Sequence, residues 1–104
     1  MKKETQQEQH QTIRRQMIDL LSRSDMNALE ISQSLSIMEK EVYDHLAHIC
    51  RSVVTHGKKC IIVPSRCIRC GYIFANRRKF TRPSRCPQCK NTHIQTARFR
   101  IAAD

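Results

Sequence analysis

The stretch CIRCGYIFANRRKFTRPSRCPQC, from Cys67 to Cys89, decides what the second half of this chain folds around. It holds two Cys-x-x-Cys pairs, Cys67 with Cys70 and Cys86 with Cys89, separated by 15 residues. This is the spacing of a four-cysteine zinc site, because each tight turn brings two sulfur atoms to about 3.5–4 Å apart around one tetrahedral ion. Four thiolates leave no open coordination position, so we expect a structural metal rather than a catalytic one.

The ligand set favours Zn2+ and also suits Fe, since both ions accept tetrahedral sulfur sites. Gly71 follows the first pair and can adopt the left-handed conformation that points backbone N–H groups at the thiolates. Lys90 stands at the equivalent position after the second pair, next to Asn91. We therefore expect the second turn to be less regular than the first.

The other two cysteines, Cys50 and Cys60, fall outside this pattern and are interpreted as small buried residues. No run of 18 apolar residues exists, which predicts no membrane-spanning helix. No apolar stretch follows Lys2 and Lys3, which predicts no signal peptide and a cytoplasmic location. In that reducing compartment cysteines are expected as metal ligands or free thiols. His45 and His48 lack an evident third partner for a second metal site.

Positive charge is concentrated in the second half of the chain. The formal net charge is +10, with −1 on residues 1–52 and +11 on residues 53–104. Such asymmetry predicts two modules, the second with a polyanionic partner. The four thiolates with a divalent ion carry −2, which two cations would balance. Seven cations lie between or beside the cysteine pairs, namely Arg66, Arg69, Arg77, Arg78, Lys79, Arg82 and Arg85.

These cations predict contacts with nucleic-acid phosphates, since guanidinium groups bind phosphate in bidentate fashion. The alternative is a solvated surface that serves solubility alone. Tyr72, Phe74 and Phe80 are interleaved with the cations and could stack on bases. We expect Tyr72 and Phe74 to form the core of so small a module instead.

The first half carries helical periodicity and capping signals. Residues 12–23 place apolar side chains at helical spacing. Residues 1–11 are predicted as a polar tail that is either frayed or a solvated extension of this helix. Asn27 with Glu30 predicts a capping box for a second helix, and Ser36 with Glu39 predicts one for a third. The third helix has Val42, Leu46, Ile49 and Val53 on one side.

Two helices joined by a very short turn and preceded by another helix are typical of a helix-turn-helix. Gly57 then ends the third helix, and residues 60–66 predict a wing strand, which Pro64 either restricts to the edge of the sheet or ends. The alternation of Ala97, Phe99 and Ile101 predicts a strand that returns to the wing. The outward side of the third helix mixes cations with Glu39 and Glu41, so it is nearly neutral; its candidate DNA contacts are Lys40, Tyr43, His48 and Arg51.

The segments EVYDHLAHICRSV, KKCIIVPSRC, CGYIF, RPSRCPQCK and ARFRI resemble a family of predicted archaeal and bacterial transcriptional regulators. These join a winged helix-turn-helix to a rubredoxin-like zinc ribbon, and the resemblance covers about residues 12–101. It implies a ribbon inserted at the wing, a last strand returning to the wing sheet, and Cys67, Cys70, Cys86 and Cys89 as metal ligands. It also implies DNA binding.

We therefore expect an α+β fold with a tail (1–11), a winged helix-turn-helix (12–66), a zinc ribbon (67–93) and a returning strand with tail (94–104). The expected function is duplex DNA binding in transcription regulation, with Lys58, Lys59, Arg77, Arg78, Lys79, Arg82 and Arg85 on phosphates. A homodimer would suit paired half-sites. The alternatives are an adaptor that binds RNA or a protein complex, and an iron-loaded electron carrier. No nucleophile–base set or phosphate-binding glycine loop occurs, so we expect no enzyme.

Overall fold

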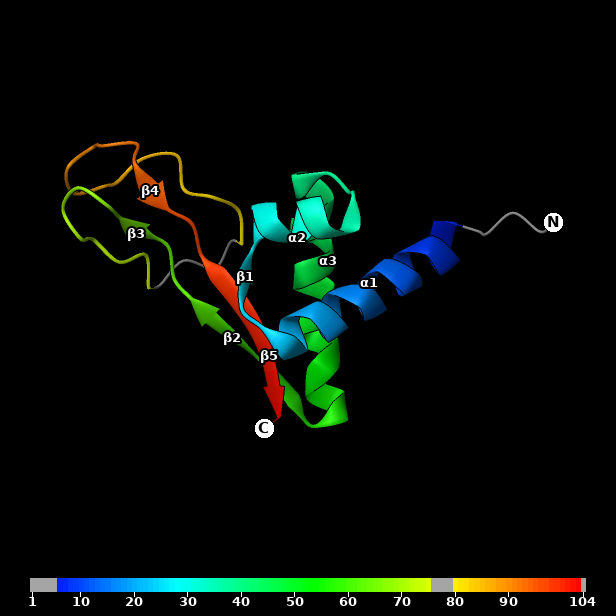
Figure 1. Cartoon of the computed structure of the whole chain (residues 1–104). Coiled ribbons are helices and arrows are strands. Elements are labelled where there is room, and N and C mark those ends of the chain that lie inside the picture. Colours follow the sequence, from blue (N-terminus) through cyan, green and yellow to red (C-terminus); the bar gives the residue numbers. More distant parts are fainter. Residues whose placement is uncertain (1–5, 76–79, 104) are drawn as a thin grey trace.

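The computed structural model describes residues 6–75 and 80–103 (Figure 1). Along the chain its elements are α1 (Gln6–Arg23), β1 (Met26–Asn27), α2 (Ala28–Leu35), α3 (Glu39–Ser52), the 3-10 helix η1 (Val53–His56), β2 (Lys58–Val63), β3 (Arg66–Cys67), β4 (Ile94–Gln95) and β5 (Arg98–Ala103). The fold is α+β, with one three-stranded sheet in the order β1-β5-β2 and one two-stranded sheet of β3 and β4. Among the described residues, no helix is long and apolar enough to span a bilayer.

The first helix is longer than the sequence predicted. It begins at Gln6, so residues 6–11 are helical rather than tail, and residues 1–5 lie outside the described residues. The sequence left open whether these residues fray or extend the helix, because the segment is polar and rich in Gln, without an apolar stripe to mark it. The helix ends at Arg23, where the Ser24 N–H still donates to the Leu20 carbonyl at 3.1 Å.

The predicted capping box of α2 is confirmed. The Asn27 side chain accepts from the Glu30 N–H at 2.8 Å, and the Glu30 carboxylate accepts from the Asn27 N–H at 3.0 Å. The predicted cap of α3 at Ser36 is wrong. Ser36 has φ 55° and closes α2 by donating its N–H to the Ser32 carbonyl, because the chain needs a left-handed residue to turn between the helices. Met38 caps α3 instead.

The hydrophobic core lies between the three helices and one face of the sheet. Every helix contributes fully buried side chains, such as Met17, Ile31 and Leu46. The predicted alternation in β5 is confirmed, since Phe99 and Ile101 are 2% and 3% exposed. β5 is therefore the strand that ties the C-terminal end of the chain to the helices.

The cysteine module is inserted between the paired strands β2 and β5. Six residue pairs join these strands, from Lys58 opposite Ala103 to Val63 opposite Arg98. The Arg66–Gln95 pair of β3 and β4 closes the inserted module, so it is slightly longer than the predicted 67–93. In Figure 1 the module projects from the end of β2 and β5 that lies away from η1. β1, which pairs with β5, was not predicted.

Cys50 and Cys60 form a disulfide, contrary to the expectation of two free buried thiols. Their Cα atoms are 5.4 Å apart, and the bond joins α3 to β2. The sequence places Cys50 on the inner side of its helix. It does not show that the turn at Gly57 returns Cys60 to the same point.

Candidate metal centre and nucleic-acid interface

The four predicted ligands meet at one point of the inserted module. All four Sγ atoms lie within 4.8 Å of one another. The Cys67–Cys89 and Cys70–Cys86 Sγ–Sγ distances are 3.5 and 3.6 Å. A tetrahedral zinc ion with Zn–S bonds of 2.3 Å requires sulfur atoms about 3.8 Å apart. The four thiols therefore fit such an ion, and Cys67, Cys70, Cys86 and Cys89 would hold it.

The two cysteine turns have the same backbone geometry. In the first, the Gly71 N–H donates to the Cys67 carbonyl at 2.9 Å, and Gly71 has φ 82°. In the second, the Lys90 N–H donates to the Cys86 carbonyl at 2.9 Å, and Lys90 has φ 64°. The expectation that the second turn would be less regular is wrong. The left-handed conformation is adopted by Lys90 and not by Asn91.

Backbone N–H groups point at the sulfur atoms, as a thiolate site requires. The N–H groups of Gln88 and Cys89 donate to the Cys86 Sγ at 3.4 and 3.5 Å. A hydrogen bond from the Cys70 N–H is the main cause that lowers the pKa of Cys67 to about 7. These donors favour the charged thiolate at Cys67 and Cys86, whereas desolvation and contacts with the neighbouring thiols raise the pKa of Cys70 and of Cys89.

The module has little apolar material of its own. Cys67 and Cys86 are fully buried, whereas Cys70 and Cys89 are exposed. The rings of Tyr72 and Phe74 meet edge to face at a centroid distance of 5.0 Å, in line with their expected place in a small core. With so small an apolar core, we expect the module to depend on a bound metal for its stability.

Two family models together cover most of the chain. Residues 12–61 match the family model "PF0610-like, N-terminal", and residues 64–104 match "PF0610 rubredoxin-like zinc beta-ribbon domain". The chain combines a PF0610-like N-terminal domain with a rubredoxin-like zinc ribbon. The solution NMR structure of protein PF0610 from Pyrococcus furiosus is 25% identical and has a TM-score of 0.76, covering 100% of this chain and 97% of that one. No curated protein matches the chain.

The predicted nucleic-acid residues fall into three groups around this PF0610-like frame. Lys40, His48 and Arg51 are exposed on α3, where Tyr43 is half-buried. Lys58 and Lys59 are exposed at the start of β2, at the end of the strand away from the ribbon. Arg82 and Arg85 are exposed on the ribbon, whereas Arg77, Arg78 and Lys79 lie outside the described residues.

One ribbon segment packs directly against the N-terminal end of α3. The Arg82 guanidinium lies 3.4 Å from the Glu39 carboxylate, which also accepts a 2.9 Å hydrogen bond from the Tyr43 hydroxyl. Burial, followed by the hydrogen bond to Glu39, raises the pKa of Tyr43. The Phe80 ring lies 5.8 Å from that of Phe99 and fixes the segment to the core. The role of Glu39 in joining the two modules was not predicted.

A shallow cleft marks this junction and is lined by Lys40, Thr81 and the three joined side chains. His45 and His48 do not face each other. His45 is buried and accepts a 3.1 Å hydrogen bond from Arg14 of α1, whereas His48 is exposed. In the described part of the chain, the group of side chains close enough to hold a metal is that of the four cysteines, and it includes neither histidine.

Proposed function

We propose that the chain is a DNA-binding transcriptional regulator of the winged helix-turn-helix type, without enzymatic activity, in which zinc stabilises the ribbon. In this proposal α3 approaches the major groove and the ribbon contacts the phosphates beside it. The observation that carries the proposal is the Arg82–Glu39 contact at 3.4 Å. It supports the proposal because Arg82 of the ribbon lies beside the N-terminal end of α3, which would meet the duplex.

The Arg82–Glu39 contact explains how a nearly neutral helix that carries carboxylates could still approach DNA. Carboxylates on a DNA-facing helix repel phosphate, and Glu39 and Glu41 both lie in the first turn of α3. Arg82 and the Tyr43 hydroxyl engage the Glu39 carboxylate. Lys40 and Arg51 remain exposed on the helix. The attraction would then come mainly from the ribbon, and the sequence discrimination from the helix.

The alternative function, an adaptor that binds RNA through the ribbon, draws on the same cations. For such an adaptor we expect substitutions on α3 to leave RNA binding intact, whereas in the proposed regulator they would weaken DNA binding. An electron carrier would require iron in the four-cysteine site. An iron-loaded sample is coloured, whereas a zinc-loaded sample is colourless, so the absorption spectrum of the purified protein separates these functions.

The test is fluorescence anisotropy of the metal-loaded protein with a mixed-sequence duplex DNA and with single-stranded RNA, at several salt concentrations. We expect duplex binding that strengthens as salt falls, and that is weakened by Lys40→Glu/Arg51→Glu and by Arg77→Glu/Arg78→Glu/Lys79→Glu. Arg100→Glu, on the opposite face of the sheet, is the matched control and should bind like the wild type. RNA binding that the helix changes leave intact would overturn the proposal in favour of the adaptor.

A further inference from the structure

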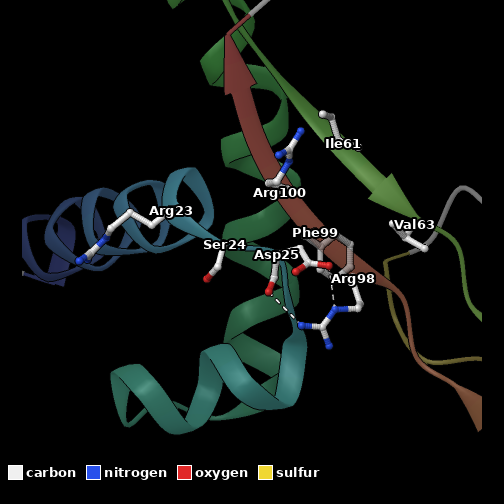
Figure 2. A pocket seen from close by; sticks show the side chains of 8 residues that line it. All are labelled: Arg23, Ser24, Asp25, Ile61, Val63, Arg98, Phe99 and Arg100. Carbon is white, nitrogen blue, oxygen red and sulfur yellow. Dashed lines mark hydrogen bonds and ion pairs between the residues drawn. The ribbon is translucent and has the colours of Figure 1, made fainter.

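The face of the sheet that points away from the helices carries a second surface with its own character. Phe99 and Ile101 point into the core, so Arg98 and Arg100 of β5 point outward. The strand register places Ile61 opposite Arg100 and Val63 opposite Arg98 (Figure 2). Each arginine of this face therefore has an aliphatic side chain beside it.

Two neighbouring hollows share lining residues on this face. The first is lined by Ile61, Val63, Arg98 and Arg100, and by the end of α1. The second shares Val63 and Arg98 and continues onto the ribbon with Arg66 and Ile73. We call this surface the outer groove. It is defined by Ile61, Val63, Arg66, Ile73, Arg98 and Arg100.

The aliphatic side chains of the outer groove are unusually open. Val63 and Ile73 are 53% and 54% exposed. Of the exposed large hydrophobic side chains among the described residues, Val63 and Ile73 line these hollows, whereas Ile62 and Ile68 do not. Single exposed aliphatics are ordinary, but neighbours that share a groove mark an interaction site.

The charged side chains that line the two hollows are mostly basic, with Asp25 as the acidic member and Arg23 paired with Asp19. The Arg98 guanidinium is engaged by Asp25 at 3.0 Å and Glu30 at 2.8 Å, so it forms a fixed wall of the groove. Arg66 donates to the neutral Gln95 side chain at 3.3 Å. Within residues 6–75 and 80–103, no acidic side chain pairs with Arg100. Arg66 and Arg100 are therefore the cations that a ligand would meet.

We infer that the outer groove binds an extended acidic peptide segment of a partner protein, with aliphatic side chains at alternate positions. Its aliphatic side chains would contact Ile61, Val63 and Ile73, and its carboxylates would pair with Arg66 and Arg100. β2 is the edge strand of its sheet in the described part of the chain, so its free edge can hydrogen-bond to an added strand.

A nucleic acid fits the outer groove less well. Aliphatic side chains make no favourable contact with phosphates. Proteins usually hold single-stranded nucleic acids by stacking the bases on aromatic rings. Phe99 is the aromatic residue that lines the groove, and it is 2% exposed with its ring in the core. The inference is independent of DNA binding, which would use the α3 side of the molecule.

The test uses a fluorescein-labelled synthetic peptide of nine residues with alternating Glu and Val, and a Lys–Val peptide of the same length as the charge-reversed probe. Anisotropy is measured with the metal-loaded wild type, Val63→Glu and Arg100→Glu. Arg51→Glu on α3 is the control, because it makes the same charge change at an exposed arginine elsewhere. Metal content and far-ultraviolet circular dichroism check that each variant is folded.

We expect the Glu–Val peptide to bind, and Val63→Glu and Arg100→Glu to weaken it about tenfold, with less than about a twofold effect from Arg51→Glu. Backbone amides of Ile61 and Val63 should shift in an NMR titration of the wild type, which needs no variant. No binding up to about 1 mM peptide, equal binding of the Lys–Val peptide, or an equal effect of Arg51→Glu would overturn the inference. So would single-stranded RNA or duplex DNA that binds in a manner sensitive to Arg100→Glu.

Discussion

The Arg82 guanidinium lies 3.4 Å from the Glu39 carboxylate and joins the ribbon to the first turn of α3. The two residues are 43 positions apart in the chain. The pair is half-exposed, so it contributes little to stability. The pair matters for charge, because the Arg82 cation and the Glu39 anion neutralise each other at the surface proposed to face DNA.

Glu39→Gln should therefore strengthen duplex binding. The change removes a negative charge and frees Arg82 for phosphate, so we expect about a three- to tenfold gain in affinity at low salt and about one unit more in the salt slope. Anisotropy titrations at several salt concentrations measure both quantities. Asp19→Asn is the matched control, since Asp19 also pairs with an arginine, Arg23, but on α1. Weaker binding by Glu39→Gln would mean instead that Glu39 contacts a base.

Local signals in the sequence predicted most of the framework. The Asn27–Glu30 capping box, the break at Gly57 and the alternation around Phe99 each depend on neighbouring residues. The four-cysteine spacing was equally readable, because two tight turns determine it.

The features that were missed depend on contacts between distant segments. The Cys50–Cys60 bond depends on where β2 returns against α3, and the Glu39–Arg82 pair depends on how the ribbon folds back. β1 has two residues, too few for any periodicity. It forms because it can pair with the edge of β5. The cap of α3 was misplaced because Ser36 was needed for a left-handed turn.

Lys90→Gly should stabilise the protein. Lys90 has φ 64°, a conformation that costs a residue with a Cβ about 1–2 kcal/mol, part of which glycine loses again as entropy in the unfolded chain. We expect a net gain of about 0.5–1 kcal/mol in the free energy of unfolding, measured by urea denaturation of the metal-loaded protein.

The reciprocal change in the other turn is Gly71→Ala. A Cβ added at Gly71 would meet no atom within 4 Å, so the loss of about 1 kcal/mol should come from the backbone alone. Lys90→Ala keeps the Cβ and should give no gain. If Lys90→Gly and Lys90→Ala were equally stable, the left-handed conformation would carry no strain at this position.

Removal of the disulfide should lower stability. For a loop closed by residues 50 and 60, the chain-entropy relation gives a loss of about 2.5 kcal/mol for Cys50→Ala/Cys60→Ala. Denaturant titrations with and without reductant provide the check, with metal content measured in parallel. The reductant should destabilise the wild type and leave the double variant unchanged. If the wild type were insensitive to reductant, the two thiols would be unpaired in solution.

Loss of the metal should unfold the ribbon before the helices. The cluster joins segments that share few apolar contacts, whereas α1, α2 and α3 share a core with β5. With a chelator, or in Cys67→Ser, the NMR amide signals of residues 66–75 should collapse while most of the helical circular dichroism at 222 nm remains. Cys50→Ser, which removes a cysteine outside the cluster, should retain the metal. Simultaneous loss of helix and ribbon would show that the two modules fold as one unit.

Stability should fall as the pH drops below about 6.5 because of His45. Burial lowers the pKa of His45, and Arg14 and His10 lower it further, while Glu41 and Asp44 act in the opposite direction. Its Nδ1 accepts the 3.1 Å hydrogen bond from Arg14, so the ring must be neutral there in the folded protein. A base whose pKa is lowered by folding binds more protons when unfolded, so its contribution to stability is complete above the unfolded pKa and is lost below it.

His45→Gln should flatten the dependence of the unfolding free energy on pH between about 7.5 and 5, whereas His48→Gln, at an exposed position of the same helix, should leave the slope unchanged. Equal slopes in the wild type and His45→Gln would assign the acid sensitivity to another group.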